Sequence, residues 1–550
     1  MKKITSILLA LMMVLGMALG GCSNKSAASP SAISGSDGAD SAAAKVTTEP
    51  GTFPISAEPI TIRIMVPVQV GHSKPFKDLK VLQDYEKMTN VHIEWEEVPQ
   101  EAYAEKYKLA LASNNLPDAF GPSFNYDTSV IYKYAKEGII IPLEDIIEKV
   151  GVNTKKYLNE REDFRKLTTF PDGHIYALPT VDENQNIRMG NFLTMNHTYL
   201  KKLGLEMPKT LDEVGDYLRK ATTTDLNGDG KNEYGLSFPS NPGGTSRITQ
   251  LFGMFGVSWE QQQYLHYTGG NSPFEFAPTM DGTRKAVEYF HGWYKEGLID
   301  PEIFTQNGQQ LKSKAKEAGV ALSITSNYPE LNSGDQSLNE YHLMDAIPGP
   351  NGDNIKSRDG LIPGYQPGQF FITSANKYPE ETIRFIDYWM DNGENALTMR
   401  FGPKDVCWSW ITPDKWTTNP KLPNGETNTQ ETATLHCTYG FGIPYWCFND
   451  FWSQKEITIE NALERGATIR DSHIKVATPG LPQIVYEEAD NREASTIKTD
   501  LFKYVESQIA QFIINGVTDQ SWDSYVSKCK SLKSERWVEL YSQYYNKMYQ

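Results

Sequence analysis

The stretch that decides the fold is ITIRIMV, residues 60–66. Its apolar side chains alternate with Thr61 and Arg63, and most of its residues are β-branched, so the pattern predicts a strand. A helical pattern follows over residues 79–88, then a second strand over 91–95 and a second helix over 103–113. Strands that alternate with helices at this spacing predict an α/β fold.

The same alternation continues toward the C-terminus. A helix is expected over residues 211–221, because Thr210 can cap its first turn and Glu213 completes a capping box. Amphipathic helices are also predicted over 382–390, 501–514 and 534–548.

Length, composition and charge narrow the class of protein. A chain of 550 residues is too long for one compact core, so two domains or more are expected. With 39% hydrophobic and 22% charged residues, the chain is neither wholly disordered nor a polytopic membrane protein. The net charge of −16 argues against nucleic acid as a partner, because phosphate binding needs clustered positive charge.

The N-terminus carries a targeting signal. Lys2 and Lys3 precede a short apolar run over 7–19, and Leu19-Gly20-Gly21-Cys22 resembles a bacterial lipobox. We therefore expect residues 1–21 to be a lipoprotein signal peptide and Cys22 to carry lipid; the alternative is an ordinary signal peptide with an incidental cysteine. Residues 22–53 are rich in Ser, Ala, Gly and Pro and predict a flexible tether. The protein is expected outside the cytoplasm, anchored to the bacterial cell membrane by palmitate-type acyl chains.

Four further cysteines are Cys407, Cys437, Cys447 and Cys529. An oxidising compartment permits disulfides, and four cysteines allow three connectivities. Buried free thiols are the alternative. A zinc site is disfavoured because no C-x-x-C spacing occurs.

A loop over residues 225–233, DLNGDGKNE, has the spacing of a calcium site. Side-chain oxygens at positions 1, 3 and 5 and glycine at position 6 match the first half of an EF-hand loop. Position 12 is Leu236, so the bidentate glutamate of a full EF-hand is missing. A solvated turn is the alternative. The expected Ca²⁺ ligands are Asp225, Asn227, Asp229, Lys231 through its carbonyl, and Glu233.

Several stretches together resemble the extracellular solute-binding proteins, family 1, of ABC importers. They are YLKKLGL at 199–205 with Pro208 and TLDE at 210–213, GHIYALP at 173–179, PGPNG at 348–352, and YPE at 378–380. The resemblance implies an α/β, two-lobed periplasmic-binding-protein-like fold of type II, with a ligand cleft between lobes joined by a hinge. It implies one lobe over 54–180 plus roughly 366–450, and a second over 181–365 plus roughly 451–550. The resemblance also implies structural calcium at residues 225–233, because proteins of this family often carry a similar D-x-N-x-[DN]-G loop that holds Ca²⁺ far from the cleft.

Candidate ligand residues come from two arguments. Segment 401–452 is unusually aromatic, and sugar sites use Trp and Tyr platforms, although core packing is an equal alternative for any one Trp. The resemblance also extends to the wider group that includes maltose-binding protein, and it implies that the crossings between lobes line the cleft. The resulting candidates are Glu183, Arg188, Trp259, Tyr328, Tyr365, Trp408 and Trp410.

The function implied is capture of an oligosaccharide and its delivery to an ABC permease, by a monomer that is not an enzyme. A secreted glycoside hydrolase with two carboxylates is one alternative. A cell-surface adhesion or signalling module is another, and a peptide or a lipid precursor is an alternative ligand. The motifs G-x-S-x-G, H-E-x-x-H and the P-loop do not occur.

Overall fold

The structure is a computed structural model. It describes residues 48–549 except 69–71, 73, 114, 124–125, 184–190, 241–246, 318, 326–330, 332–339, 358–364, 429, 439, 441 and 456–459. Within these residues the chain forms two α/β assemblies, each built on its own sheet.

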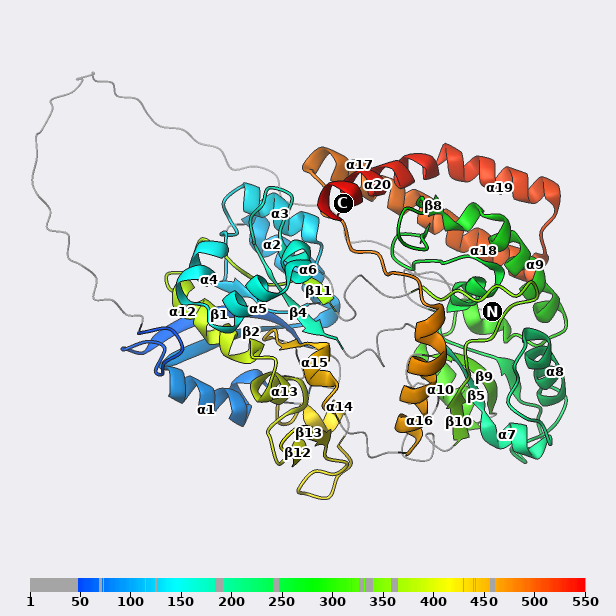
Figure 1. The fold of residues 1–550 in the computed structure, drawn as a ribbon, viewed down its shortest axis with the longest axis horizontal. Helices are drawn as coiled ribbons and strands as arrows, with labels where there is room; N and C mark the ends of the chain where they lie inside the picture. Colours follow the sequence, from blue (N-terminus) through cyan, green and yellow to red (C-terminus); the bar gives the residue numbers. More distant parts are fainter. Residues whose placement is uncertain are drawn as a thin grey trace, which may run out of the picture. The chain divides into compact units, whose positions relative to one another are not determined.

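The first sheet takes strands from both halves of the chain (Figure 1). Its order is β14-β4-β11-β3-β1-β2, with bounds β1 Ile60–Val68, β2 Val91–Pro99, β3 Ala119–Phe120, β4 Leu178–Asp182, β11 Tyr365–Ile372 and β14 Trp446–Cys447. Strand β1 pairs parallel to β2 and β3, whereas β11 pairs antiparallel to β3 and β4. The predicted strand at 60–66 is therefore confirmed as an interior strand of the sheet, between β3 and β2, with most of its side chains buried.

The first sheet is covered by helices and carries an added hairpin. The helices are α1 Lys80–Thr89, α2 Gln100–Ser113, α3 Thr128–Lys136, α4 Glu144–Val150, α5 Asn153–Glu160, α6 Glu162–Thr168, α12 Pro379–Asp387, α13 Glu394–Phe401, α14 Gln430–Ala433 and α15 Asn449–Trp452, with short 3₁₀ turns η1 Phe76–Asp78 and η6 Tyr388–Met390. The hairpin joins β12 Trp408–Thr412 to β13 Lys415–Thr418.

The second sheet has the order β10-β5-β9-β6, with bounds β5 Phe192–Asn196, β6 Tyr234–Leu236, β9 Val320–Thr325 and β10 Tyr341–Leu343. Around it lie α7 His197–Lys202, α8 Leu211–Ala221, η2 Arg247–Phe255, a small pair β7 Leu265–His266 and β8 Glu275–Phe276, η3 Ala277–Thr279, α9 Asp281–Lys295, η4 Pro301–Phe304 and α10 Gly308–Glu317. The chain continues through α16 Glu460–Thr468, η7 Ile469–His473 and η8 Ile474–Val476.

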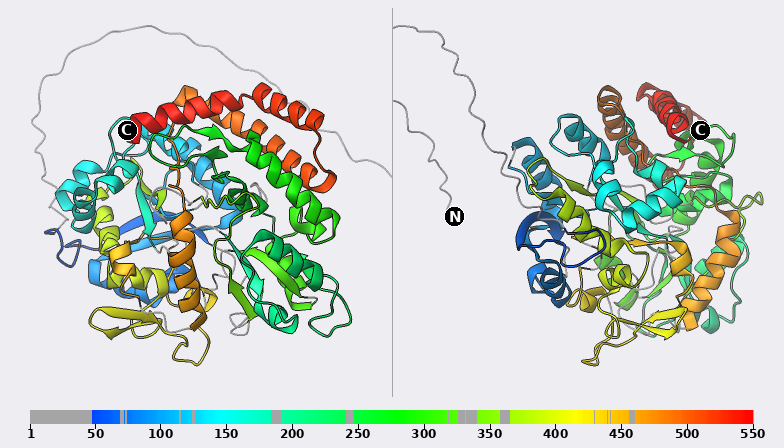
Figure 2. Two further views of the ribbon diagram at one scale, coloured as in Figure 1. Left: turned by 45° about the vertical axis from the view of Figure 1, so that its right-hand side comes forward. Right: turned by 60° about the vertical axis from the view of Figure 1, so that its left-hand side comes forward.

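The C-terminal helices extend the core of the second assembly. They are α17 Glu488–Ile497, the π turn η9 Lys498–Phe502, α18 Lys503–Asn515, α19 Asp519–Ser531 and α20 Ser534–Tyr549. Figures 1 and 2 show these orange-to-red helices, with α18 alongside the green helix α9. Their buried side chains join one apolar cluster with those of α8, α9 and β9. The C-terminal helices therefore add buried apolar side chains to the core of the second assembly, whose sheet has only short strands.

Helix α8 confirms the capping prediction with one difference. Thr210 Oγ1 accepts from the Glu213 backbone N–H at 3.2 Å, as expected. The Glu213 carboxylate accepts from the Lys209 backbone N–H at 2.7 Å instead of from that of Thr210. The helix start is therefore capped on both sides, with the return bond displaced by one residue.

The predicted tether is wrong at its C-terminal end. Arg384 of α12 is buried, and its guanidinium donates to the carbonyls of Thr48, Glu49, Thr52 and Ile55 at 2.7–3.1 Å. The guanidinium is planar and has five N–H donors, so one arginine can bond several backbone carbonyls of a segment. The composition of that segment gives no sign of such a distant partner. Residues 48–53 are therefore part of the first assembly.

No helix within the described ranges is long and apolar enough to cross a membrane. The predicted signal peptide and Cys22 lie outside the described residues.

Candidate ligand-binding site and calcium loop

The chain connects one edge of strand ends in the first sheet to one edge of strand ends in the second. In the first sheet, the pairing directions bring the carboxyl ends of β3 and β4 and the start of β11 to one edge. In the second, the carboxyl ends of β9 and β10 share an edge with the start of β5. The chain passes from β4 to β5 and returns from β10 to β11, so both crossings run between these edges. Open α/β sheets hold ligands at such strand ends.

At the first crossing, two adjacent carboxylates hold their surroundings together. Glu183 accepts from Arg161 Nη1 at 2.8 Å with one oxygen and from the Asn449 backbone N–H at 2.9 Å with the other. Asp182 Oδ2 accepts from Arg400 Nε at 3.2 Å and from Tyr445 Oη at 3.1 Å. The Glu183 side chain is only 8% exposed. Both of its oxygens are used within the protein, so Glu183 joins the end of β4 to Arg161 and to the start of α15.

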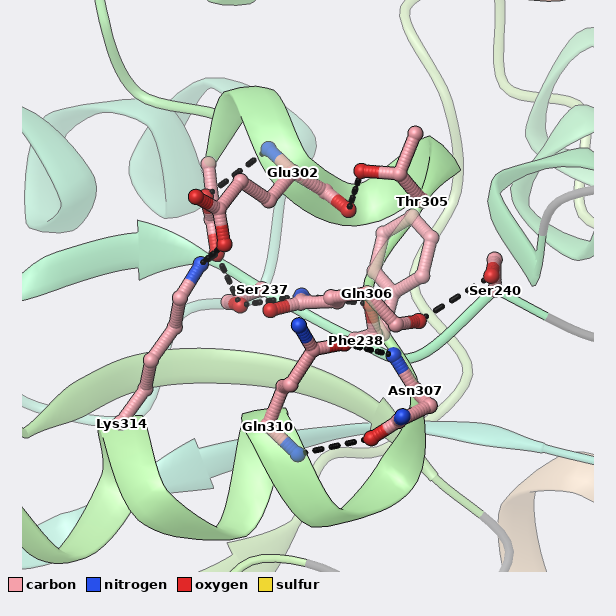
Figure 3. A network of polar contacts seen from close by, with 10 residues as sticks. Ser237, Phe238, Ser240, Glu302, Thr305, Gln306, Asn307, Gln310 and Lys314 are labelled. Atoms are coloured by element: carbon pink, nitrogen blue, oxygen red, sulfur yellow. Dashed lines mark hydrogen bonds and ion pairs between the residues drawn. The ribbon is translucent and has the colours of Figure 1, made fainter. Parts of the chain in front are cut away.

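At the second sheet, a polar network fixes the segment that follows β6 (Figure 3). Gln306 Nε2 donates to Ser237 Oγ at 2.9 Å and to the Phe238 backbone carbonyl at 2.8 Å. The backbone carbonyl of Gln306 accepts from Ser240 Oγ. Lys314 Nζ lies 2.7 Å from Asp300 and 2.8 Å from Glu302. Burial lowers the pKa of Lys314, but the two acidic partners outweigh it and raise that pKa. The sequence does not reveal this network, because its members come from three separate segments, 237–240, 300–306 and Lys314.

Two of the predicted ligand residues remain partly exposed in the first assembly. Tyr365 begins β11 opposite Val181, and its hydroxyl donates to the Leu167 carbonyl at 2.7 Å. Trp410 donates from Nε1 to Glu394 at 2.6 Å. Arg188 and Tyr328, which come after β4 and β9 in the sequence, lie outside the described residues.

Trp408 and Trp259 differ from the prediction. They are 0% and 1% exposed, so neither offers a face to a ligand in this structure. Trp408 lies in β12 and packs edge-on against Trp416. Trp259 packs against Phe252 in the second core.

Most of the aromatic segment 401–452 belongs to the first core. Trp408, Trp416, Tyr445, Trp446 and Trp452 are all buried, and Tyr439 lies outside the described residues. Phe401, Trp416 and Trp452 surround the Lys455 ammonium at 5.2–5.5 Å from the ring centres. Burial lowers the pKa of Lys455 to about 8. The core-packing alternative therefore holds for these tryptophans.

The loop at 225–233 has the turns that its spacing predicts. Gly228 and Gly230 have φ values of 86° and 84°, which only glycine adopts without strain. Asp225 accepts from both of their backbone N–H groups, and Glu233 Oε1 accepts from those of Leu226 and Asn227.

The fit of this loop to a cation rests on its oxygens. Glu233 Oε2 is buried without a hydrogen-bond partner in the described chain, and burial raises the pKa of Glu233. Asp225, Asn227 and Asp229 add hard oxygen donors, which suit Ca²⁺. In the described ranges, no three His, Cys, Asp or Glu side chains are already gathered as metal ligands. The donor set therefore fits calcium, but its side chains would have to converge on the ion.

The four cysteines are buried free thiols, so the structure supports that alternative over disulfides. Burial raises the pKa of Cys407 to about 11 and that of Cys529 to about 12, which keeps both thiols protonated near neutral pH.

Comparison with known proteins gives matches along most of the chain. The family model of the bacterial extracellular solute-binding proteins matches residues 73–396. The fructooligosaccharide ABC transporter substrate-binding protein FusA of Streptococcus pneumoniae is 27% identical over 513 residues, or 90% of this chain and 91% of FusA. Lipoprotein LipO of Bacillus subtilis is 24% identical over 355 residues, 62% of this chain and 66% of LipO.

A solved structure is also similar. The S. pneumoniae FusA EF-hand mutant in complex with fructo-nystose has a TM-score of 0.76 and 25% identity, covering 88% of this chain and 99% of that one. The likeness confirms the predicted two-lobed fold.

Proposed function

The chain belongs to the bacterial extracellular solute-binding proteins, and from this we propose that it captures an oligosaccharide and hands it to the membrane permease of an ABC importer. The likeness to FusA, which is named for fructooligosaccharide transport, supports a carbohydrate ligand. The family places the chain outside the cytoplasm.

The observation that carries the proposal is the path of the chain from β4 to β5 and from β10 to β11. Both connect strand ends of the first sheet to strand ends of the second, so a ligand between these edges would touch both lobes. Hinge closure around the ligand would then complete the site. We assign residues 48–182 and 365–455 to one lobe and 192–343 and 460–549 to the other, which moves the first boundary to include the segment held by Arg384.

Some of the candidate ligand residues are retained in this proposal. Tyr365 and Trp410 are partly exposed, and Arg188 and Tyr328 come shortly after β4 and β9 in the sequence. Glu183 acts as a positioning residue, because its oxygens are already bonded. Trp259 and Trp408 are assigned to packing.

The proposal extends to the anchor and the metal. Lipid on Cys22 would tether the receptor beside its permease, and the likeness to a protein named as a lipoprotein supports this. The loop at 225–233 would hold one Ca²⁺ through Asp225, Asn227, Asp229, the Lys231 carbonyl and Glu233. A relative whose structure is described as an EF-hand mutant supports the metal. Bound calcium would supply structural stability only.

The experiment is a titration of intrinsic Trp fluorescence with nystose, maltotetraose and trigalacturonic acid, with chromatography of the same mixtures. Saturable binding of an oligosaccharide without release of monosaccharide supports the receptor. Released monosaccharide would identify a hydrolase instead. No binding across the panel contradicts the proposed carbohydrate class.

A further inference from the structure

A pocket of about 380 Å³ lies between helix α6 and the C-terminal helix α20. Its volume is within the range of small-molecule sites in proteins. One wall comes from α6 and the turn that follows it, in the first assembly, and the other from the end of α20, in the second. None of the lining residues lies at the strand ends or among the predicted ligand residues, so the pocket shares no residue with the candidate oligosaccharide site.

Two buried rings line the pocket, one on each wall. Phe170 is 6% exposed and packs against Tyr132 of α3, with ring centroids 5.8 Å apart. Tyr132 Oη donates to the Glu487 carboxylate at 3.2 Å, and the Glu487 backbone N–H donates to Tyr544 Oη at 3.1 Å. The Tyr544 hydroxyl donates in turn to Asp490 at 2.7 Å. Contacts therefore run without a break from one wall of the pocket to the other.

Apolar packing also joins the two walls. Ile484 and Tyr486, which precede α17, belong to the apolar cluster of the second assembly. Val485 lies between them in sequence and belongs instead to a cluster of the first assembly that includes Tyr132 and Phe170. Successive side chains of this segment therefore enter two different cores, and the pocket is bounded by packed elements on both sides.

The charged residues of the pocket are mostly basic, in a protein whose net charge is −16. Arg165, Lys166 and Lys547 line the pocket and are exposed. Among the described lining residues Glu162 alone is acidic, and it pairs with Lys166 at 3.0 Å. Arg165 donates to the side-chain oxygen of Asn159 at 3.0 Å. In the part of the chain that the structure describes, neither Arg165 nor Lys547 has a carboxylate partner, so one unneutralised cation stands on each wall.

We propose that this pocket is a second binding site, which takes an organic anion with a carboxylate or phosphate joined to a flat apolar group. The anionic group would lie between Arg165 and Lys547, because a guanidinium and an ammonium both donate charge-assisted hydrogen bonds to such oxygens. The flat group would lie on Phe170, Tyr544 and Met548, whose thioether adapts to varied shapes. An anion held in this way contacts both assemblies.

The test is an NMR titration of the wild-type protein with phenyl phosphate, which joins an anion to one aromatic ring. We expect saturable binding with a dissociation constant below about 1 mM. Inorganic phosphate and benzyl alcohol, which each supply one part of the contact, should bind more weakly. Arg165→Gln and Lys547→Gln should each weaken phenyl phosphate binding about tenfold, the size of one hydrogen bond to a charged group.

Lys528→Gln is the matched control and should leave the affinity for phenyl phosphate unchanged. Lys528 is likewise exposed and lies in the last turn of its helix, α19, but does not line the pocket. An equal loss in this variant would overturn the inference, because it indicates attraction to surface charge alone. Melting temperatures identify folded variants, and if Arg165→Gln or Lys547→Gln does not fold, the other decides.

Two further results would overturn the inference. One is the absence of saturable phenyl phosphate binding up to about 10 mM. The other is a parallel loss of nystose affinity in Arg165→Gln and Lys547→Gln, which would place the pocket in the oligosaccharide site; we expect that affinity to stay unchanged. If wild type binds no nystose, the proposed function fails, while the phenyl phosphate titration still decides this inference.

Discussion

Glu183 and Asp182 stand together where the chain leaves the first sheet, and each is tied to an arginine from another segment. The sequence indicated a carboxylate at Glu183 but assigned it to the ligand. Its partners Arg161 and Asn449 are 22 and 266 residues away, so no local pattern could reveal that its oxygens are used.

Replacing Glu183 should therefore cost stability. In Glu183→Ala, Arg161 loses its buried partner and the Asn449 N–H its acceptor, which together should lower the free energy of unfolding by about 2–3 kcal/mol. Asp163→Ala is the control, because Asp163 pairs with the same guanidinium but is 57% exposed, and it should cost about 0.5 kcal/mol or less. Urea denaturation measures both, and equal losses would contradict the assignment.

Trp408 gives a second prediction at this scale. Because its ring is fully buried, Trp408→Ala should lower the free energy of unfolding by about 3–5 kcal/mol and leave oligosaccharide affinity of the folded protein unchanged. Trp410→Ala, at a partly exposed ring, should cost less stability. Urea denaturation and calorimetry on the same samples separate the two roles. Weaker binding at unchanged stability would restore Trp408 as a platform.

At the scale of elements, the alternation of apolar and polar residues and the helix-capping residues predicted those strands and helices that local sequence determines. The strand at 60–66 and the helix at 211–221 lie where expected, because period and caps are local signals. The hairpin at 408–418 has no counterpart among the elements predicted from the sequence. Burial of its Trp408 ring depends on α13 and α15, which the local sequence does not show.

The loop at 225–233 yields a prediction for this element. Calcium at 100 times its dissociation constant should add about 2.7 kcal/mol to the free energy of unfolding, and EDTA should remove it. Asp229→Ala should abolish the calcium-dependent rise in melting temperature, whereas Asp216→Ala, an exposed residue of α8 outside the loop, should keep it. A melting temperature that ignores calcium in wild type would refute the metal site.

For the whole molecule, the order of strands in the sheets could not be predicted from local sequence patterns. Each sheet draws strands from distant parts of the chain, with β11 and β14 returning to pair beside β4. Hydrophobic periodicity identifies such strands but not their neighbours. The family resemblance supplied the two-lobed arrangement, and the pairing directions of β4 with β11 and of β5 with β9 give it a physical basis at the sheet edges.

The central claim is that one oligosaccharide is held between the strand ends of both sheets. Hydrogen exchange by mass spectrometry, with and without saturating nystose, tests it most directly, because ligand contact and closure slow amide opening at the site. We expect added protection at both edges, in peptides around 120–127 and 182–192 of the first sheet and around 237–250 of the second. Protection confined to one sheet, or none at saturation, would contradict it.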